Sequence, residues 1–336
     1  MKETYFLGGI TSEGFHTRFT ELLNHPDYYA YILKGGPGTG KSTLMKKIAA
    51  EAIEAEEDAE LFYCSSDPES LDAVVLRGRK IIVADGTAPH IFEPVYPGIN
   101  GEIINLGSLL NKSKLSVHFG KITEYTNESK RFRERVNRLV RGAASVNSDI
   151  YNMAYEALNT DKLTAYCNDF AARHITVKNR YKSTPGKLSY RQLSALTLNG
   201  YTTMPVSEKY TAYTVKDPFF AASDFFLRLL AEYALNMGID VTVSEFTLIP
   251  NFTFEYVLLK DHGIAPGISC ISLKNFYDST KLSMNKEKLI FSKKLSRELS
   301  KGAAENMQCA LEFHNKTEEF YSDAMNWDGL KTVLPF

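Results

Sequence analysis

A lysine and a serine that follow a glycine-rich turn are the residues of this 336-residue chain best suited to phosphate chemistry. They end the run Gly35-Gly36-Pro37-Gly38-Thr39-Gly40-Lys41-Ser42, which fits the pattern G-x-x-x-x-G-K-S/T. Glycines allow a tight turn whose backbone N–H groups point at one anion, and the dipole of a following helix favours negative charge there. Lys41 would reach the β- and γ-phosphates of a nucleotide, and Ser42 would bind Mg²⁺. The predicted nucleotide-binding residues are Gly36, Pro37, Gly38, Thr39, Gly40, Lys41, Ser42 and Thr43.

The segments on either side of this run favour the same chemistry. Residues 28–34 (YYAYILK) are aromatic and aliphatic enough for a buried strand, and residues 43–54 have the pattern of a helix. A strand, a glycine turn and a helix in this order are what the motif requires. A chance glycine turn before a helix is the alternative, and the flanking elements argue against it.

A second part of the predicted site ends in Asp85. Residues 80–84 (KIIVA) predict a buried strand, and residues 61–64 (LFYC) predict another one before it, followed by a polar turn over residues 65–72. Near the start of the chain, residues 11–23 predict a helix that Thr11 or Ser12 would cap. Apolar residues that run into an aspartate, two strands after the loop, are typical of the strand whose carboxylate holds Mg²⁺. The alternative is that Asp85 serves only the turn that it forms with Gly86. The turns after these two strands should meet beside the nucleotide.

Those turns contain further candidates for catalysis. Asp67 is our first choice for the base that accepts a proton from the attacking nucleophile, because Gly86 stands where many ATPases have a water-positioning glutamate. Asp67 equally fits an Asx turn before Pro68. His90 would sense the γ-phosphate, although a histidine in a turn is more often structural. The predicted catalytic residues are Lys41, Asp67, Asp85 and His90, and the predicted metal ligands are Ser42 and Asp85.

The composition argues against several other classes of protein. The chain has 39 Lys and Arg against 40 Asp and Glu, and a net charge of -1 does not suit a general polyanion binder. No apolar run approaches the roughly 18 residues of a membrane-spanning helix, and no signal peptide is recognisable. The four cysteines lack C-x-x-C spacing, which argues against a disulfide framework and a zinc site. We therefore expect a cytoplasmic protein with reduced cysteines.

Between residues 114 and 172 the pattern becomes helical. Phe132, Val136 and Val140 belong to an apolar stripe, while basic residues line another face. The basic cluster fits a solvated helix face, a lid that closes on phosphates, or a nucleic-acid patch. The last is least favoured, because no aromatic-rich single-strand motif accompanies the cluster. Its members are Lys130, Arg131, Arg133, Arg135, Arg138 and Arg141.

The second half of the chain repeats the first. Residues 30–53 align without a gap on residues 212–235, and Thr11-x-x-Gly14-Phe15 is echoed by Thr197-x-x-Gly200-Tyr201. A tandem duplication explains the common order of the matches better than shared secondary structure does. The further matches are 71–76 with 254–259, 114–116 with 281–283, and 141–144 with 301–304.

The second copy has lost the glycine turn. The run Asp217-Pro218-Phe219-Phe220-Ala221-Ala222-Ser223-Asp224 stands in its place, so the rings of Phe219 and Phe220 would fill the phosphate space while Asp217 and Asp224 would repel phosphates. His262 replaces Asp85, and Gly267 replaces His90. Residues 173–187 are basic and contain Pro185-Gly186, which makes them the expected boundary between the copies. The predicted domains are 1–175, which binds nucleotide, and 188–336, a degenerate repeat.

The chain resembles the P-loop NTPase superfamily, and more closely a group of bacterial ATP-binding proteins built from two consecutive P-loop halves. The similarity rests on YFLGG-x-TSEGF (5–15), LKGGPGTGKSTLMKKI (33–48), CSSDPESLDAVV (64–75), DGTAPH (85–90) and EIINLG (102–107). The superfamily implies Mg²⁺-ATP bound by Gly38, Gly40, Lys41, Ser42 and Thr43, with Asp85 on the metal. The degenerate second loop argues against a mechanism that needs two ATP sites.

The expected fold class is α/β, with two tandem P-loop NTPase-like domains that each combine a mostly parallel sheet, flanking helices and a helical extension. Three functions fit it. The first is an ATPase with one Mg²⁺-dependent site and a second half that is a pseudo-NTPase scaffold or regulator. The second is a small-molecule or nucleotide kinase, in which the helix of Arg131 to Arg141 closes as a lid over a phosphoryl acceptor. The third is a non-catalytic ATP-dependent module that binds a protein partner. ATP is favoured over GTP because no N-K-x-D signature occurs, and the oligomeric state is open.

Overall fold

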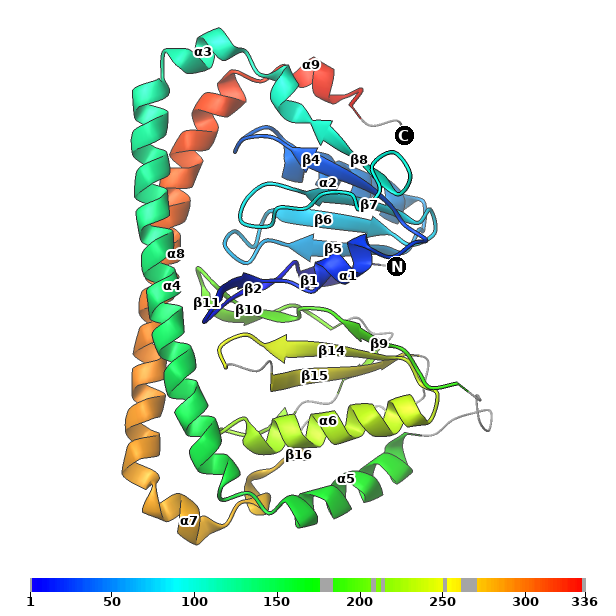
Figure 1. Cartoon of the computed structure of the whole chain (residues 1–336), viewed down its shortest axis with the longest axis vertical. Helices are drawn as coiled ribbons and strands as arrows, with labels where there is room; N and C mark the ends of the chain where they lie inside the picture. Colours follow the sequence, from blue (N-terminus) through cyan, green and yellow to red (C-terminus); the bar gives the residue numbers. More distant parts are fainter. Residues whose placement is uncertain are drawn as a thin grey trace.

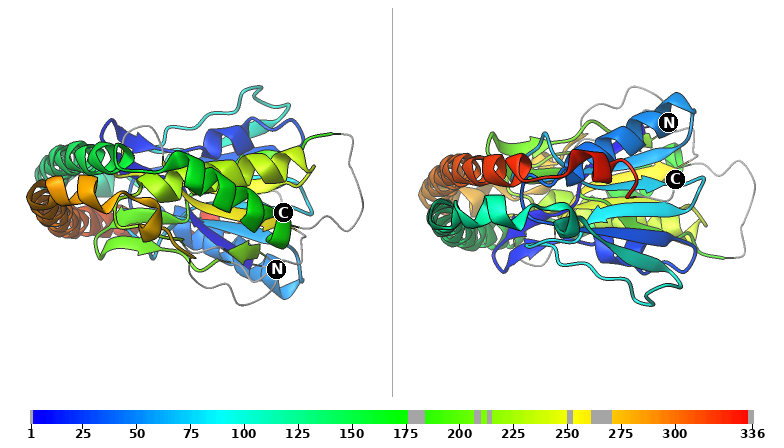
Figure 2. Two further views of the ribbon diagram at one scale, coloured as in Figure 1. Left: turned by 90° about the horizontal axis from the view of Figure 1, so that it is seen from below. Right: turned by 90° about the horizontal axis from the view of Figure 1, so that it is seen from above.

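A computed structural model describes residues 2–175, 184–206, 210–212, 215–249, 253–260 and 271–333. The chain forms two α/β lobes stacked along its long axis, and two long helices run beside both of them (Figure 1). Seen along that axis, the two helices lie side by side at one edge of the molecule (Figure 2). Within the described ranges, no helix combines the length and the apolar character that crossing a membrane requires.

The first lobe is built on a six-stranded sheet with the order β1-β5-β6-β7-β4-β8. The pairs β1–β5, β7–β4 and β4–β8 are parallel, and β6 runs against both of its neighbours. A mixed α/β fold with a mostly parallel central sheet confirms the coarse fold class expected from the sequence. The strands are β1 (Lys2–Phe6), β4 (Tyr29–Lys34), β5 (Ala59–Tyr63), β6 (Leu71–Leu76), β7 (Ile81–Asp85) and β8 (Gly101–Asn105).

Strand β4 lies inside the sheet because its residues are apolar on both faces. Ile32 packs with helix α1 (Phe19–Leu23) and with residues of the second lobe. Leu33 packs on the other face, against helix α2 (Lys41–Glu54). The two-residue period of a strand thus makes two buried faces from one apolar run. Because β4 is held inside the sheet in this way, the glycine turn that follows it lies at the carboxyl edge of the sheet.

Two expectations for the first lobe were wrong. Residues 11–23, expected as a helix, instead form a hairpin of β2 (Gly9–Thr11) and β3 (Gly14–His16) before the short helix α1. The hairpin is favoured because Gly14 has a φ of +113°, and the Thr11 hydroxyl donates a hydrogen bond to the Gly14 carbonyl. The polar turn after β5 ends before residue 71, where β6 begins and enters the sheet between β5 and β7.

The second lobe has a smaller sheet with the order β12-β15-β14-β9. Only the β14–β9 pair is parallel among the described pairs of this sheet, so the expectation of a mostly parallel sheet in each half does not hold for them. A parallel pair, β13 with β16, lies apart from it. Residues 261–270, which the repeat aligns with the region of β7, lie outside the described residues, and so do His262 and Gly267. The strands are β9 (Leu188–Tyr190), β12 (Tyr210–Ala212), β13 (Val215–Lys216), β14 (Val241–Phe246), β15 (Thr253–Lys260) and β16 (Ile271–Ser272).

The aligned segments of the two halves adopt matching local structures. A hairpin of β10 (Ser194–Thr197) and β11 (Gly200–Thr203) repeats the β2–β3 hairpin, and the Thr197 hydroxyl donates to the Gly200 carbonyl as Thr11 does to Gly14. Helix α6 (Ala221–Asn236) stands where the alignment places the counterpart of α2. The sequence repeat therefore coincides with repeated elements.

The helices connect the lobes. The long helices α4 and α8 are antiparallel, since Ser129 contacts Ala310 near one end and Asn147 contacts Ser296 near the other. Small residues let them approach closely: a Cβ on Gly142 would lie 3.4 Å from a methyl carbon of Leu299. Besides α1, α2 and α6, the helices of the described residues are α3 (Lys112–Ser116), α4 (Phe119–Tyr155), α5 (Thr160–His174), α7 (Ser279–Met284), α8 (Lys286–Asp323) and α9 (Trp327–Leu330), with 3₁₀ turns η1 (Leu106–Leu109) and η2 (Lys274–Phe276).

The end of each half of the chain packs in the lobe formed mainly by the other half. Helix α4 leaves the first lobe, so α5 packs on α6 in the core of the second lobe, where Phe170 contacts Phe226. Helix α8 returns, so that Met325 and Leu330 enter the core of the first lobe. The predicted limits 1–175 and 188–336 therefore follow chain order and not the lobes in space. Residues 176–183 of the predicted boundary lie outside the described residues.

A half-buried carboxyl group in the second lobe gives a stability prediction. Glu255 lies on β15 and accepts a hydrogen bond from the Tyr201 hydroxyl at 3.1 Å. Burial raises the pKa of Glu255 from 4.5 to about 7. Because the folded protein holds this proton more tightly than the unfolded chain, the stability that the group contributes is complete below pH 4.5. It is lost as the pH rises through about 7.

We therefore expect Glu255→Gln to remove this pH dependence. The free energy of unfolding of the natural chain should fall by up to about 3 kcal/mol between pH 4.5 and pH 8 because of this group. The variant should lack that part of the fall, while Glu232→Gln, at an exposed position on α6, should keep it. Urea unfolding at pH 5 and pH 8 measures the difference. An identical pH dependence in all three proteins would contradict the prediction.

Candidate functional site

The turn between β4 and α2, residues 35–40, is called the glycine loop below. Gly38 and Gly40 have φ values of +68° and +82°, in the left-handed region that side chains rarely adopt. Thr39 is buried, and its hydroxyl donates to the Gly36 carbonyl at 2.9 Å, which closes the turn. Gly40 gives α2 no side-chain cap. The start of α2 therefore offers backbone N–H groups and the positive end of a helix dipole to an anion.

Lys41 joins the glycine loop to β7. Its ammonium group donates to the carbonyls of Gly35 and Gly36, at 3.0 and 2.8 Å, and lies 3.6 Å from Oδ2 of Asp85. The side chains of Lys41 and Asp85 are only 10% and 13% exposed. The structure thus brings together the cation and the carboxylate that the sequence assigned to one site, from elements 44 residues apart.

The other oxygen of Asp85 serves the following turn. Oδ1 accepts hydrogen bonds from the backbone N–H and the hydroxyl of Thr87, at 2.8 and 2.6 Å. The two interpretations of Asp85, as a turn residue and as a site residue, are therefore compatible. Ser42 lies beside the same edge of the sheet, and its Oγ accepts a hydrogen bond from the backbone N–H of Leu71 at 3.0 Å.

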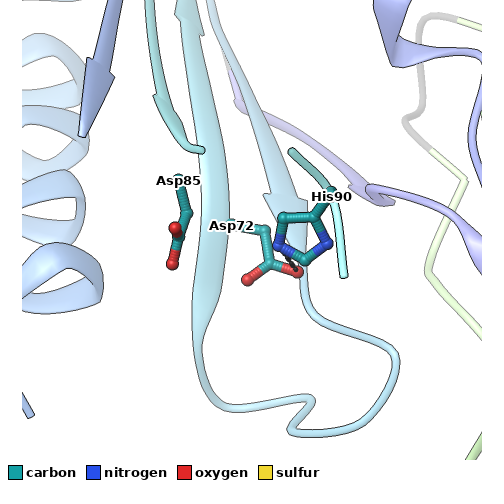
Figure 3. Close-up of side chains that lie close together, drawn as sticks. All are labelled: Asp72, Asp85 and His90. Atoms are coloured by element: carbon teal, nitrogen blue, oxygen red, sulfur yellow. Dashed lines mark ion pairs between the residues drawn. The ribbon is translucent and has the colours of Figure 1, made fainter. Parts of the chain in front are cut away.

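Asp85 belongs to a compact group with Asp72 and His90 (Figure 3). One ligand atom from each lies within 4.8 Å of the others, and His90 Nε2 is 3.6 Å from Asp72 Oδ2. The His90 ring lies between Phe15 and Phe92. Its buried Nδ1 has no hydrogen-bond partner within the described part of the chain. The group therefore offers carboxylate oxygens suited to a hard cation and an imidazole suited to proton exchange.

Asp67 takes a different position from the one expected of a base. Its carboxylate accepts hydrogen bonds from the backbone N–H of Glu69 and from the Ser70 hydroxyl, which is the Asx turn that the sequence left as the alternative. Asp72, five residues later, is the carboxylate that reaches Asp85. The sequence offered Asp72 as one of three acidic candidates in the turn after β5, behind Asp67, although it interrupts the otherwise apolar β6, LDAVVL. A charged residue inside a buried strand was the signal that could have found it.

The thiol at the end of β5 is not set up as a nucleophile. Burial raises the pKa of Cys64 well above its ordinary value, and the carboxylate of Asp72 raises it further. Cys64 therefore stays protonated at neutral pH. Cys64, Cys167 and Cys309 are free cysteines, and Cys270 lies outside the described residues.

The C-terminal end of α8 covers the glycine loop, a contact that no local pattern predicts. Oε1 of Glu318 accepts a hydrogen bond from the Gly38 N–H at 3.1 Å. A Cβ on Gly36 would lie 2.7 Å from the Tyr321 ring, and one on Gly40 would lie 2.9 Å from the Trp327 ring. The loop therefore meets residues from the other end of the chain.

Most of the basic cluster on α4 matches the solvated-face interpretation. Arg131, Arg135 and Arg138 are exposed. Arg133 is exposed as well, and its Nη2 lies 3.4 Å from Nδ1 of His314 on α8. Arg133 thus has a partner on the neighbouring long helix.

The second loop is filled by its own carboxylate. Asp217 accepts hydrogen bonds from the backbone N–H groups of Phe219 and Ser223, at 3.0 and 2.9 Å, and from the Tyr277 hydroxyl. Phe220, aligned with Gly38, keeps a left-handed φ of +69°. Asp224 does not face this loop, because it accepts hydrogen bonds from Tyr151, Arg228 and the backbone of Phe254. Only Asp217 thus takes the place of an anion, and it does so by binding the N–H groups.

Comparison of the chain with protein-family models, with curated proteins and with solved structures finds no match. The case for a function is carried by the geometry of the glycine loop, Lys41 and Asp85.

Proposed function

We propose that the protein binds one Mg²⁺-ATP per chain at the glycine loop of the first lobe and hydrolyses it. The two lobes are then tandem P-loop-like domains, of which the second is a scaffold or regulator that binds no nucleotide at its loop. The observation that carries the proposal is the contact of Lys41 with both the left-handed glycine loop and Asp85. Lysine, glycine turn and strand-end carboxylate together make up a phosphate and metal site.

Each group has a role in this proposal. The N–H groups of the loop and of the first turn of α2 would hold the phosphates, and Lys41 would exchange the carbonyls of Gly35 and Gly36 for phosphate oxygens. Ser42 and Asp85 would hold Mg²⁺, which fits their oxygen atoms and spreads the negative charge of the phosphates. A hydroxyl and carboxylates next to a lysine are a suitable donor set for a magnesium-bound polyphosphate.

The proton acceptor for the attacking water is proposed to be the Asp72–His90 pair. Both side chains are buried, and Asp72 lies between His90 and Asp85 (Figure 3). Nε2 of His90 lies 3.6 Å from Asp72, and its Nδ1 has no partner among the described residues. The ring can therefore take up a proton. The role of Asp67 as a base stays a prediction. Its carboxylate is engaged in the Asx turn, which makes it less available to accept a proton.

A test of the metal assignment is Asp85→Asn. We expect this variant to bind ATP in the presence of Mg²⁺ no more tightly than the natural chain binds it in EDTA, because the amide removes the anionic ligand. Equilibrium dialysis with labelled ATP, with Mg²⁺ or EDTA, measures the difference. Glu69→Gln, an exposed carboxylate in the neighbouring turn, is the matched control and should keep the natural response to Mg²⁺. A normal response to Mg²⁺ in Asp85→Asn would exclude Asp85 as a ligand.

A further inference from the structure

We propose that Glu318 is an internal competitor of the nucleotide, which must leave the Gly38 N–H before a phosphate can bind there. The inference rests on the proposed function and names a regulation of the same site. Its consequence is that ATP binding moves the C-terminal end of α8 relative to the glycine loop. A hydrogen bond from the Gly38 N–H to Glu318 joins the two elements.

Glu318 and a phosphate group would use the same donor. The Gly38 N–H donates to Oε1 of Glu318 at 3.1 Å, and Gly38 lies in the middle of the run whose N–H groups surround phosphates. A carboxylate and a phosphate are both anions, so they repel each other when they approach the same N–H group. Binding of one therefore excludes the other from Gly38.

The surroundings of the Glu318 carboxylate are cationic and would suit a phosphate equally. His314, one turn earlier on α8, places Nε2 at 3.4 Å from Oε1 of Glu318, and Arg133 of α4 stands behind His314. The hydrogen bond from His314, followed by the Gly38 N–H and the charge of Lys41, holds the pKa of Glu318 below its usual range against burial. A phosphate that replaced the carboxylate would thus meet His314 directly, with Arg133 one contact behind it.

The two loops of the chain differ in whether their carboxylate can leave. Asp217 belongs to the second loop itself, and the Tyr277 hydroxyl holds it in place. Glu318 comes from a different element, and its side chain is 42% exposed. The second loop is therefore permanently occupied, whereas the occupant of the first loop has solvent to move into.

Movement of Glu318 involves the helix that carries it. A Cβ on Gly38 would lie 2.4 Å from the Glu318 carbonyl oxygen, so the backbone of α8 touches the loop as well. Tyr321 and Trp327 contact the loop at Gly36 and Gly40. A nucleotide that displaces Glu318 therefore also changes the contacts of the segment that follows it.

Two readouts test this inference. Isothermal titration with Mg²⁺-ATP should show about tenfold tighter binding by Glu318→Gln than by the natural chain, because the competing charge is gone. Glu318→Ala should behave in the same way, and Glu319→Gln, the exposed neighbour on α8, should bind as the natural chain does. Trp327 is the only tryptophan of the chain, so its fluorescence should change when Mg²⁺-ATP is added.

The outcomes separate this inference from the proposed function. Equal or weaker ATP binding by Glu318→Gln and Glu318→Ala, in a natural chain that does bind ATP, would overturn the inference and leave the proposed function standing. Unchanged Trp327 fluorescence at saturating ATP would also count against it. Failure of every protein, including the natural chain, to bind ATP would overturn the proposed function and the inference together.

Discussion

Replacement of Lys41 by alanine is expected to lower the rate of phosphate release from Mg²⁺-ATP by at least about 100-fold, the usual loss when one preorganised electrostatic contact to the reacting group is removed. Lys41 is the cation that contacts both the glycine loop and Asp85, through the carbonyls of Gly35 and Gly36 and a distance of 3.6 Å to the carboxylate. Its loss also removes one positive charge from beside the phosphates, which disfavours polyphosphate binding.

Phosphate release by purified natural chain and Lys41→Ala measures this effect. Lys46→Ala is the matched control, because Lys46 lies on the same helix but is exposed. It should retain the natural rate. A Lys41→Ala variant that folds and still releases phosphate at the natural rate would show that hydrolysis occurs elsewhere. A natural chain that binds ATP and releases no phosphate would direct attention to a phosphoryl acceptor, as in a kinase, or to a partner that recognises the bound state.

The largest expected effect on stability comes from Glu60, which is only 1% exposed and lies between the lobes. Its carboxylate accepts hydrogen bonds from Arg77 of the first lobe and from Arg191 of the second, each at 2.6 Å. Burial alone would raise the pKa of Glu60, but the two arginines hold it below its usual range. We expect Glu60→Ala to lower the free energy of unfolding by about 3–5 kcal/mol, because the buried Arg191 guanidinium loses the anion that compensates its burial, while Arg77 retains Glu3 at 3.4 Å.

Urea unfolding of Glu60→Ala beside Glu51→Ala tests this prediction. Glu51 forms an exposed ion pair with Lys47, and its loss should cost less than about 1 kcal/mol. Because the pKa of Glu60 is lowered in the folded state, its contribution is present above the unfolded pKa of about 4.5 and is lost as the pH falls below it. The excess cost of Glu60→Ala should therefore shrink in acid. Equal costs for the two variants would contradict the account of the interface.

The local part of the site was predictable from the sequence. The order of β4, glycine loop and α2 follows from an apolar run, glycines at left-handed positions and helical periodicity, all within about 25 residues. The position of Asp85 follows from its place at the end of an apolar strand, because the carboxyl ends of neighbouring parallel strands meet. These features depend on short-range rules that hold without knowledge of the rest of the chain.

The contacts that the sequence did not predict depend on tertiary packing. The position of Asp72 beside Asp85 could be predicted only by knowing where β6 begins, and β6 is defined by its antiparallel neighbours and not by its own pattern. The contact of Glu318 with Gly38 joins residues 280 positions apart and exists because α4 and α8 carry the chain from one lobe to the other and back. Arg133 differs from the other arginines of its helix only in the neighbour that it faces. No local periodicity encodes such pairings.

The most direct test of the central claim is the stoichiometry of Mg²⁺-ATP binding, measured by equilibrium dialysis at saturation. The account predicts one nucleotide per chain, lost in Lys41→Ala and kept in Ser223→Ala, which alters the aligned position of the second loop, where Asp217 binds the backbone N–H of Ser223. Absence of binding, two nucleotides per chain, or one nucleotide that persists in Lys41→Ala would contradict a single site at the glycine loop.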